Sequence, residues 1–426
     1  MKKAILLTLD NDVSEIKALA ASLGYTIVQE FFQQREKPDV NTYVGRGKIE
    51  EIKTFLEEND VVDLIIVDGE LKPSQWFNLE KEFSKEVYDR IRVILALFAE
   101  RAESTEAKLQ VKLAQLRYER PFVRELIHRA RAGEHPGFMA GGEYQVDDYY
   151  ELIKRQMKQI REKLKKLRAS RELRRKHRYK AGFYLIAIAG YTNAGKSSLL
   201  NLLSDERVRV EETLFSTLSP TTRRISKKQC FTTARPPLLL TDTVGFIKDL
   251  PSWVIDAFHS TLEEIAVADL VLLVVDISDP VEEIKLKLET SLKELREIAA
   301  SSSIVLVFNK MDRVKDENIL AAKIKDLEDV IDGMPYVCVS ILQKTNTEEL
   351  IETTSQNLPA LTQVKMVLPF TEEAQRFVSM LYEKAWIIDT KYSSKITVDV
   401  AINQRIYDKI VSSCQRIGGR VYATAK

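Results

Sequence analysis

Apolar and polar positions alternate along the first hundred residues in the way that is typical of a small α/β unit. Short apolar runs at Ala4–Leu7, Leu64–Val67 and Val93–Leu97 suggest buried strands, and stretches such as Ile49–Glu58 have the spacing of amphipathic helices. Strands separated by helices favour a parallel sheet. We therefore expect an N-terminal α/β domain over residues 1–105.

From Ala107 the spacing changes to that of long helices. Leu109, Leu113 and Leu116 fall on one helical face. A second series repeats at alternating steps of four and three, as in a seam between helices, and its members are Ile153, Met157, Ile160, Leu164 and Leu167. The glycine-rich segment 133–142 lets the chain reverse between them. The pattern predicts an antiparallel helical hairpin over residues 106–180.

Strand and helix patterns alternate again over residues 181–363 and predict a doubly wound, mostly parallel sheet. Beyond them, Thr371–Leu381 has the pattern of a capped helix. One later segment alternates as a half-buried strand does, and its inward positions are Ile396, Val398, Val400 and Ile402. Residues 364–426 should therefore form a small C-terminal α+β domain.

The composition of the 426 residues is that of a folded globular chain, with 45% hydrophobic residues, 30% charged residues and a net charge of +1. The charge is unevenly spread. Between Ile153 and Lys180 stand 14 lysines and arginines against two glutamates, a local charge of +12. Such a face is either a solvated helix surface or a contact for RNA phosphates, and charge alone does not separate the two. A dimeric coiled coil is a third interpretation, which the short connection between the helices disfavours.

The cysteines and the apolar runs indicate the compartment. Cys230, Cys338 and Cys414 lie far apart, which suits a reducing environment. No stretch approaches the ~18 apolar residues of a membrane span, and the run after Met1 is too short for a signal peptide. We expect a cytoplasmic protein without a membrane span that acts as a monomer.

A phosphate-binding loop lies between an apolar strand at Phe183–Ala189 and a helix at Ser198–Leu203. The loop consists of Gly190, Tyr191, Thr192, Asn193, Ala194, Gly195, Lys196 and Ser197. This is the GxxxxGK[ST] pattern in its strand-loop-helix context, which a chance glycine turn explains poorly. Backbone N–H groups and Lys196 would hold the phosphates, the Ser197 hydroxyl would bind Mg²⁺, and the nucleotide contacts should extend to Ser198.

A DxxG loop follows the apolar strand Leu238–Leu240. It consists of Asp242, Thr243, Val244 and Gly245. Asp242 would reach Mg²⁺ through water, and the Gly245 N–H would face the γ-phosphate. Phe246 stands where many GTPases carry a water-orienting glutamine. Because an apolar ring cannot orient water, we expect either slow hydrolysis that depends on a partner or a packing role for Phe246.

An NKxD sequence indicates guanine. It follows the strand Ile304–Phe308 and consists of Asn309, Lys310, Met311 and Asp312. The Asp312 carboxylate can accept hydrogen bonds from guanine N1–H and the exocyclic amine, whereas adenine would leave it desolvated and unpaired. Such a site discriminates by about 10⁴ in affinity. The predicted substrate is therefore GTP, hydrolysed to GDP, rather than ATP.

Other residues should complete the base site. Lys310 would lie along the base, and Asn309 would brace neighbouring loops. After the strand Tyr336–Val339, a backbone N–H of Ser340 or Ile341 should meet guanine O6.

Between the phosphate and DxxG loops we expect a switch that supplies a hydroxyl to Mg²⁺ when the γ-phosphate is present. The predicted nucleotide contacts there are Phe215, Ser216, Thr217, Leu218 and Ser219. Thr217, Thr221 and Thr222 are candidates for the hydroxyl, and we choose Thr217 as the magnesium ligand beside Ser197; turn capping is the alternative role of the other threonines. The catalytic roles are assigned to Lys196, Thr217, Gly245 and Phe246.

The sequence resembles the HflX family of translational GTPases over nearly its whole length. The matching segments are Tyr43–Lys48, Glu70–Gln75, Lys108–Leu116, Gly190–Ser197, Leu214–Arg224 and Asp242–Pro251. The resemblance implies GTP hydrolysis with Mg²⁺ on Ser197 and Thr217, association with the large ribosomal subunit and its RNA, and splitting or rescue of ribosomes. It also implies a second nucleotide activity in the N-terminal domain. Gly45–Lys48 is the place to look for that activity, although a glycine turn before a helix needs no ligand.

Two positions depart from the family. Ala140-Gly141-Gly142-Glu143 replaces a Gly-Pro-Gly-Glu loop between the hairpin helices, and Ile341 stands where the guanine loop has alanine. Two alternative functions stay open. A ribosome-assembly GTPase would use the same parts on an immature subunit, and an RNA-binding scaffold with negligible turnover would suit Phe246. Asp312 argues against a stand-alone ATPase.

Overall fold

The computed structural model describes residues 2–59, 61–131, 142–180, 183–204, 221–225, 238–246, 251, 253–254, 259–298 and 302–423. The chain divides into two compact units. The first holds the described residues up to Leu167 together with residues 251, 253 and 254, and the second holds the remainder. Among the described helices, none has the length and apolar character needed to cross a membrane.

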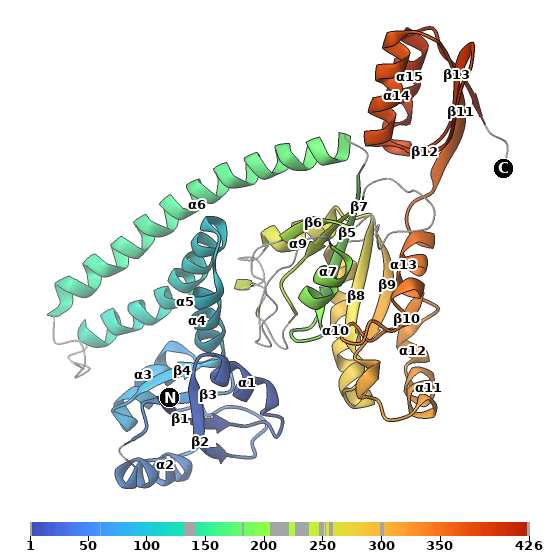
Figure 1. Ribbon diagram of the computed structural model, residues 1–426. Coiled ribbons are helices and arrows are strands. Elements are labelled where there is room, and N and C mark those ends of the chain that lie inside the picture. The colour runs from blue at the N-terminus through green and yellow to red at the C-terminus, as the bar shows by residue number, and fades with distance from the viewer. Residues whose placement is uncertain are drawn as a thin grey trace. The chain divides into compact units, whose positions relative to one another are not determined.

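A four-stranded parallel sheet begins the first unit, with strand order β2-β1-β3-β4 (Figure 1). In chain order the elements are β1 (Lys2–Thr8), α1 (Ser14–Ser22), β2 (Tyr25–Phe32), α2 (Arg46–Glu58), β3 (Leu64–Val67), α3 (Pro73–Phe83), β4 (Glu86–Asp89) and α4 (Arg90–Arg101). Ile52 of α2 and Leu79 of α3 are buried in one core with Ile5 and Ile65 of the strands. The expected parallel α/β fold is confirmed.

One expected strand is a helix instead. Val93–Leu97 lies inside α4, where Ile91 and Phe98 are buried as well, and the fourth strand is the preceding β4. A continuous apolar run fits a helix buried on several sides as well as it fits a buried strand, so periodicity could not separate them. The Asp89 side chain accepts a hydrogen bond from the Arg92 N–H at 2.8 Å and starts the helix.

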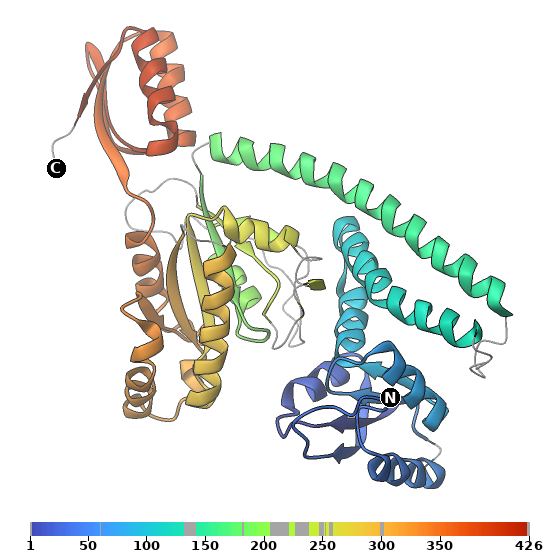
Figure 2. The ribbon, with the colours of Figure 1, turned by 180° about the vertical axis from the view of Figure 1, so that it is seen from behind.

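The two long helices α5 (Thr105–Arg131) and α6 (Gly142–Lys180) pack against each other along the predicted seam. The buried members of that seam are Leu116, Val123 and Ile127 of α5 and Ile153, Met157 and Ile160 of α6. Both views show α5 beside the first half of α6 (Figures 1 and 2). Pairing within one chain confirms the expected hairpin. Ala140 and Gly141, where the loop departs from the family, lie outside the described residues.

The second unit contains a six-stranded sheet in the order β10-β9-β8-β5-β7-β6. Its strands are β5 (Tyr184–Gly190), β6 (Thr221–Arg224), β7 (Leu238–Asp242), β8 (Leu270–Asp276), β9 (Ser303–Asn309) and β10 (Tyr336–Cys338). All neighbouring pairs are parallel except β6 with β7. This is the predicted doubly wound sheet. Its parallel strands end along one edge, which is where such sheets bind ligands.

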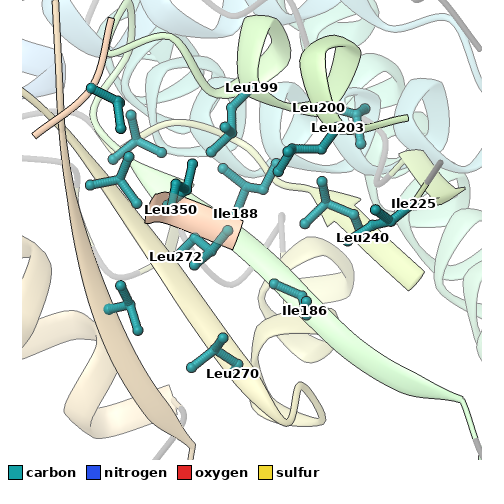
Figure 3. Close-up of a cluster of buried hydrophobic side chains, with 14 of the residues drawn as sticks. Ile186, Ile188, Leu199, Leu200, Leu203, Ile225, Leu240, Leu270, Leu272 and Leu350 are labelled. Atoms are coloured by element: carbon teal, nitrogen blue, oxygen red, sulfur yellow. The ribbon is translucent and has the colours of Figure 1, made fainter. Parts of the chain in front are cut away.

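Helices cover both faces of this sheet. They are α7 (Lys196–Leu203), α9 (His259–Ala266), α10 (Val281–Ile298), the short 3₁₀ helix η1 (Met311–Arg313), α11 (Glu317–Asp326), α12 (Glu328–Ile331) and α13 (Thr347–Gln356). Leucines of α7 and Leu350 of α13 pack over one face (Figure 3). The other face is buried under α9 and α10 (Figure 2). The two cores hold the strand ends, and therefore the loops that follow them, in place.

The C-terminal elements follow the order βαββαβ. They are β11 (Leu361–Pro369), α14 (Glu372–Lys384), β12 (Trp386–Tyr392), β13 (Lys395–Asn403), α15 (Gln404–Arg416) and β14 (Arg420–Ala423). The sheet is antiparallel with order β12-β13-β11-β14, and both helices pack on one face (Figure 1). Thr371 caps α14 as expected, because its Oγ1 accepts the Ala374 N–H at 3.3 Å. The expected small α+β domain is confirmed.

Candidate functional site

Gly195 lets the loop after β5 approach the loop after β9. It has a φ of +104°, which L side chains rarely adopt, and a Cβ there would stand 2.2 Å from Asn309 Nδ2. That nitrogen donates to the Ala194 carbonyl at 2.8 Å. The phosphate and base halves of the predicted site are therefore held together by a side-chain hydrogen bond that only glycine accommodates.

Lys196 is the first residue of α7 and is 8% exposed. Its Nζ donates to the Tyr191 carbonyl at 2.6 Å, within the loop itself. Burial lowers the pKa of Lys196 to about 8, and the negative charge of Asp242 opposes that shift. A desolvated ammonium at a helix N-terminus gains from an incoming anion, so Lys196 is placed to receive phosphate oxygens.

Ser197 and Asp242 meet at the carboxyl edge of the sheet, one from α7 and the other from the end of β7. The Ser197 Oγ donates to Asp242 Oδ2 at 2.8 Å, and the residues are 7% and 1% exposed. Hydroxyl and carboxylate oxygens are the donors that Mg²⁺ prefers. The pair therefore fits the predicted magnesium site. Ser197 would bind the ion directly and Asp242 through water.

The DxxG loop is fixed against the phosphate loop. Thr243 follows Asp242 directly, and its Oγ1 donates to the Ile188 carbonyl at 2.7 Å. The next residue, Val244, is half-buried. A Cβ on Gly245 would stand 2.7 Å from Lys196 Nζ and 2.9 Å from the Thr192 nitrogen. Gly245 therefore passes directly beside the phosphate-binding lysine, where its N–H was predicted to face the γ-phosphate.

Phe246 points into the core. It is 5% exposed and belongs to the apolar cluster under α9 and α10. Its ring meets that of Tyr191 edge-on, with centroids 6.4 Å apart, and its backbone N–H donates to the Gly190 carbonyl at 3.0 Å. Of the two roles expected for Phe246, this geometry favours packing, because the ring fills space under the loop.

The remaining phosphate-loop residues complete the first turn around the site. Tyr191 and Ala194 are buried, Thr192 and Ser198 are half-buried, and Asn193 is exposed with a φ of +62°. The exposed asparagine adopts the left-handed region that this residue type tolerates. The loop therefore keeps its apolar side chains inside and turns its backbone toward the carboxyl edge of the sheet.

The base-binding loops are braced by side chains. Ser340 Oγ donates to Asp312 Oδ1 at 2.5 Å and orients that carboxylate. The Ile341 N–H donates to Asn309 Oδ1 at 3.2 Å, and the Ser340 N–H donates to the Thr345 carbonyl at 3.3 Å. Both N–H groups that we expected to meet guanine O6 are thus engaged within the protein. A bound base would have to share the Ile341 N–H with Asn309.

Asp276 lies near the site but belongs to none of the sequence motifs. It ends β8, and its Oδ2 lies 2.5 Å from the Nζ of Lys310. This ion pair holds Lys310 across the ends of two adjacent strands. The sequence does place Asp276 near the site, because it is the first acidic residue after the apolar run of β8. The ends of parallel strands line ligand sites.

The predicted switch residues Phe215, Ser216, Thr217, Leu218 and Ser219 lie outside the described residues, and the role of Thr217 stays a prediction. Thr221 and Thr222, the alternatives, belong to β6. Thr222 Oγ1 lies 3.0 Å from Thr241 Oγ1 on the neighbouring strand. This contact gives Thr222 a structural role at the edge of the sheet.

The glycine segment at Gly45–Lys48 starts α2. Gly45 is the N-cap residue, and its N–H donates to Gln33 Oε1 at 2.8 Å. The Lys48 ammonium pairs with Glu51 at 2.6 Å. These contacts explain the segment as the start of a helix without a ligand.

The phosphate, DxxG and NKxD loops thus meet at the carboxyl edge of one mostly parallel sheet. That combination defines a P-loop GTPase.

Comparisons with known proteins identify the family. The chain is 38% identical over 413 residues to GTPase HflX of Thermococcus kodakarensis, which covers 93% of this chain and 90% of that protein. It is 44% identical over 305 residues to GTPase HflX of Methanocaldococcus jannaschii, 72% of this chain and 73% of that protein. The chain belongs to the HflX family and is a GTP-hydrolysing enzyme, so the resemblance noted in the sequence is confirmed.

Three family models match successive regions. They are described as GTP-binding GTPase N-terminal for residues 10–99, GTP-binding GTPase Middle Region for residues 101–178, and 50S ribosome-binding GTPase for residues 185–310. A similar solved structure is that of a GTP-binding protein from the hyperthermophilic archaeon Sulfolobus solfataricus in complex with GDP. It is 26% identical, covers 84% of this chain and 98% of that chain, and has a TM-score of 0.47.

Proposed function

We propose that this GTPase acts on the large ribosomal subunit in the cytoplasm, in the splitting or rescue of ribosomes, with GTP and Mg²⁺ as the switch. The observation that carries the proposal is the basic face of α6, with 14 lysines and arginines against two glutamates between Ile153 and Lys180. Cations at this density match the phosphates of RNA. The description of the family model over residues 185–310 as a 50S ribosome-binding GTPase supports the same partner.

The cations of α6 differ in their contacts. Lys158, Arg161 and Lys165 are exposed. Arg168, which is also exposed, and Arg171 reach Glu263 of α9, at 2.8 Å and 3.6 Å. α9 follows the DxxG loop along the chain. A movement of that loop on a change of nucleotide would therefore be transmitted to α6 through the ion pairs with Glu263.

Nucleotide binding would use the residues of the carboxyl edge. Lys196 would hold phosphate oxygens, while Ser197 and Thr217 would hold Mg²⁺, which neutralises charge on the phosphates when it is bound. Gly245 would report the γ-phosphate through its N–H. With Phe246 in the core, the chain itself supplies no glutamine at that position to orient water, so we expect slow turnover until a partner binds.

Guanine specificity can be tested by exchanging donor and acceptor at Asp312. In Asp312→Asn the side-chain NH₂ would face the guanine amine, and because both groups are hydrogen-bond donors they cannot pair. The affinity for GTP should therefore fall at least a hundredfold. Xanthine carries a carbonyl where guanine carries that amine, so xanthosine triphosphate should bind Asp312→Asn better than the native chain. Asp326→Asn, a change of the same kind on α11, should alter neither affinity. Equal loss of both nucleotides in Asp312→Asn would indicate misfolding rather than recognition.

Association with the ribosome is tested by measuring steady-state GTP turnover of the purified protein, alone and with large ribosomal subunits, over a series of salt concentrations. We expect stimulation by the subunits that declines as salt rises, because the contact is made to phosphates. Reversing three exposed charges, in Lys158→Glu with Arg161→Glu and Lys165→Glu, should abolish stimulation and leave the basal rate unchanged.

The outcomes separate the alternatives. Stimulation by immature subunits and not by mature ones would replace rescue with ribosome assembly. GTP-dependent binding to subunits without any increase in turnover would favour the RNA-binding scaffold. Unchanged turnover and no binding would contradict the proposed partner.

A further inference from the structure

The ion pair between Asp276 and Lys310 lies at the nucleotide edge of the sheet, where β8 and β9 end side by side. Asp276 stands opposite Asn309 at the last register position of the two strands. The Asp276 and Lys310 side chains are 13% and 15% exposed. An ion pair so far removed from water adds little net stability, because the cost of desolvation offsets the attraction. Its place beside the NKxD loop therefore points to a role in nucleotide binding.

The Asp276 carboxylate is fixed by its own loop. Its Oδ1 accepts hydrogen bonds from the Ser278 N–H at 3.0 Å and the Ser278 Oγ at 2.6 Å. The Lys323 ammonium donates to the carbonyls of Ile277 and Asp279, at 2.9 Å and 2.6 Å, and closes the loop from the other side. With Oδ1 occupied in this way, Oδ2 is left in a defined position to receive Lys310.

Lys310 is held as firmly as its partner. Its φ of +66° lies in the left-handed region, which a residue with a Cβ keeps only where the surrounding structure over-determines it. Its Nζ donates to Asp276 Oδ2. The lysine side chain is therefore fixed at both ends, by the turn that begins η1 and by the carboxylate at the end of β8.

The carboxylate expected to bind guanine is only two residues further on. Asp312 Oδ1 accepts the Ser340 Oγ, and among the residues that the structure describes Asp312 takes part in no ion pair. An ammonium on a flexible four-carbon stem is a natural partner for a carboxylate this near in the chain. If Lys310 occupied Asp312, the acceptor positions needed by the guanine N1–H and amine would be taken.

We propose that Asp276 is a positioning residue for guanine recognition. By holding the Lys310 ammonium at the end of β8, it leaves the Asp312 carboxylate to the base. The inference rests on the guanine contact proposed above for Asp312, and it does not involve the ribosome.

The test compares the affinities of GDP and inosine diphosphate for the full chain by calorimetry, without ribosomes. Inosine lacks the exocyclic amine, so the ratio of the two affinities reports the bond from that amine to Asp312. Asp276→Asn keeps the size of the side chain and releases the ammonium. GDP should then lose about tenfold in affinity, and inosine diphosphate, which makes one of the two bonds, about threefold. Damage to packing alone would weaken both nucleotides equally.

A second substitution separates the charge of Lys310 from its stem. Lys310→Met keeps the apolar stem without the ammonium, so Asp276→Asn has no cation to release in that background. The double variant should therefore show the same GDP preference as Lys310→Met alone. Asp329→Asn, which breaks an exposed ion pair with Lys285 at 3.1 Å, should change neither affinity.

Two results would overturn the proposal. One is a native GDP preference in Asp276→Asn, and the other is a double variant as impaired as Asp276→Asn. If Asp276→Asn does not fold, Asp276→Ser takes its place, and failure of both to fold would also overturn the proposal, because the pair would then serve folding. Asp312→Asn is measured beside them. A native preference in Asp312→Asn would contradict the guanine contact itself, whereas a native preference in Asp276→Asn contradicts only the role of Asp276.

Discussion

At the scale of single residues, the site depends on a few buried polar groups whose partners come from distant parts of the chain. Ser197 meets Asp242, Asn309 meets Ala194, and Ser340 orients the Asp312 carboxylate. The first two bonds are buried and the third is partly buried, so removing Asp242 or Asn309 would cost a buried polar group its hydrogen bond. The three loops are therefore linked to one another by hydrogen bonds within the protein.

The role of Phe246 can be decided at this scale by Phe246→Leu. The ring is 5% exposed in a well-packed core, so we expect a loss of about 1–2 kcal/mol in the free energy of unfolding. Basal GTP turnover should stay within about threefold of the native value. Urea denaturation and a phosphate-release assay measure the two quantities. A large drop in turnover with unchanged stability would instead give Phe246 a part in hydrolysis.

At the scale of elements, strand ends and helix starts determine where charge can be buried. Asp89 ends β4 and caps α4, where it accepts hydrogen bonds from the N–H groups of Arg92 and Leu71 at 2.8 Å and 3.1 Å. Burial nevertheless raises the pKa of Asp89 to about 6, and the hydrogen bonds, including one from Tyr118 of α5, only partly oppose it. A carboxylate is thus kept in a core that favours its protonated form.

This cap should make the stability of the first unit depend on pH. The pKa of Asp89 is higher in the folded chain than in the unfolded chain, so the folded state takes up a proton first as the pH falls. The contribution of Asp89 to the free energy of unfolding should rise by about 1 kcal/mol between pH 7 and pH 5. Urea midpoints of the native chain and Asp89→Asn, compared at both pH values, isolate this contribution. Parallel pH profiles of the two proteins would contradict it.

At the scale of the whole molecule, the cores are separate. Among the residues that the structure describes, the apolar cluster of the C-terminal sheet, around Met366 and Val398, shares no member with the clusters on the two faces of the GTPase sheet. Leu361, at the start of β11, does pack against the core around Leu199. The join therefore lies within β11, close to the domain boundary predicted at residues 363 and 364.

A chain that ends after Thr362 tests that boundary. It keeps Leu361 and the hydrogen bond from the Tyr184 hydroxyl to the Pro359 carbonyl, at 2.8 Å. We expect it to fold and to bind GDP within about twofold of the full chain, measured by calorimetry. Loss of GDP binding or of the cooperative unfolding transition would show that the C-terminal sheet is part of the same folding unit.

Some features of the fold and site could be predicted from the sequence because they are local. The phosphate loop needs its glycines and its lysine in one stretch, and the seam of the hairpin repeats at a fixed step, so both are visible without knowing what lies opposite. The same holds for the alternation of β13 and for the Thr371 cap. Local pattern was insufficient for Val93–Leu97, where burial from several sides removes the difference between helix and strand.

The sequence by itself therefore determined the nucleotide, the order of the loops and the class of fold. Only the tertiary structure decided which groups face each other. The pairing of Asp276 with Lys310 and the burial of Phe246 beside Tyr191 each join residues that are remote in the chain. Such contacts depend on the order of strands and the packing of helices, and no residue carries that information in its own neighbourhood.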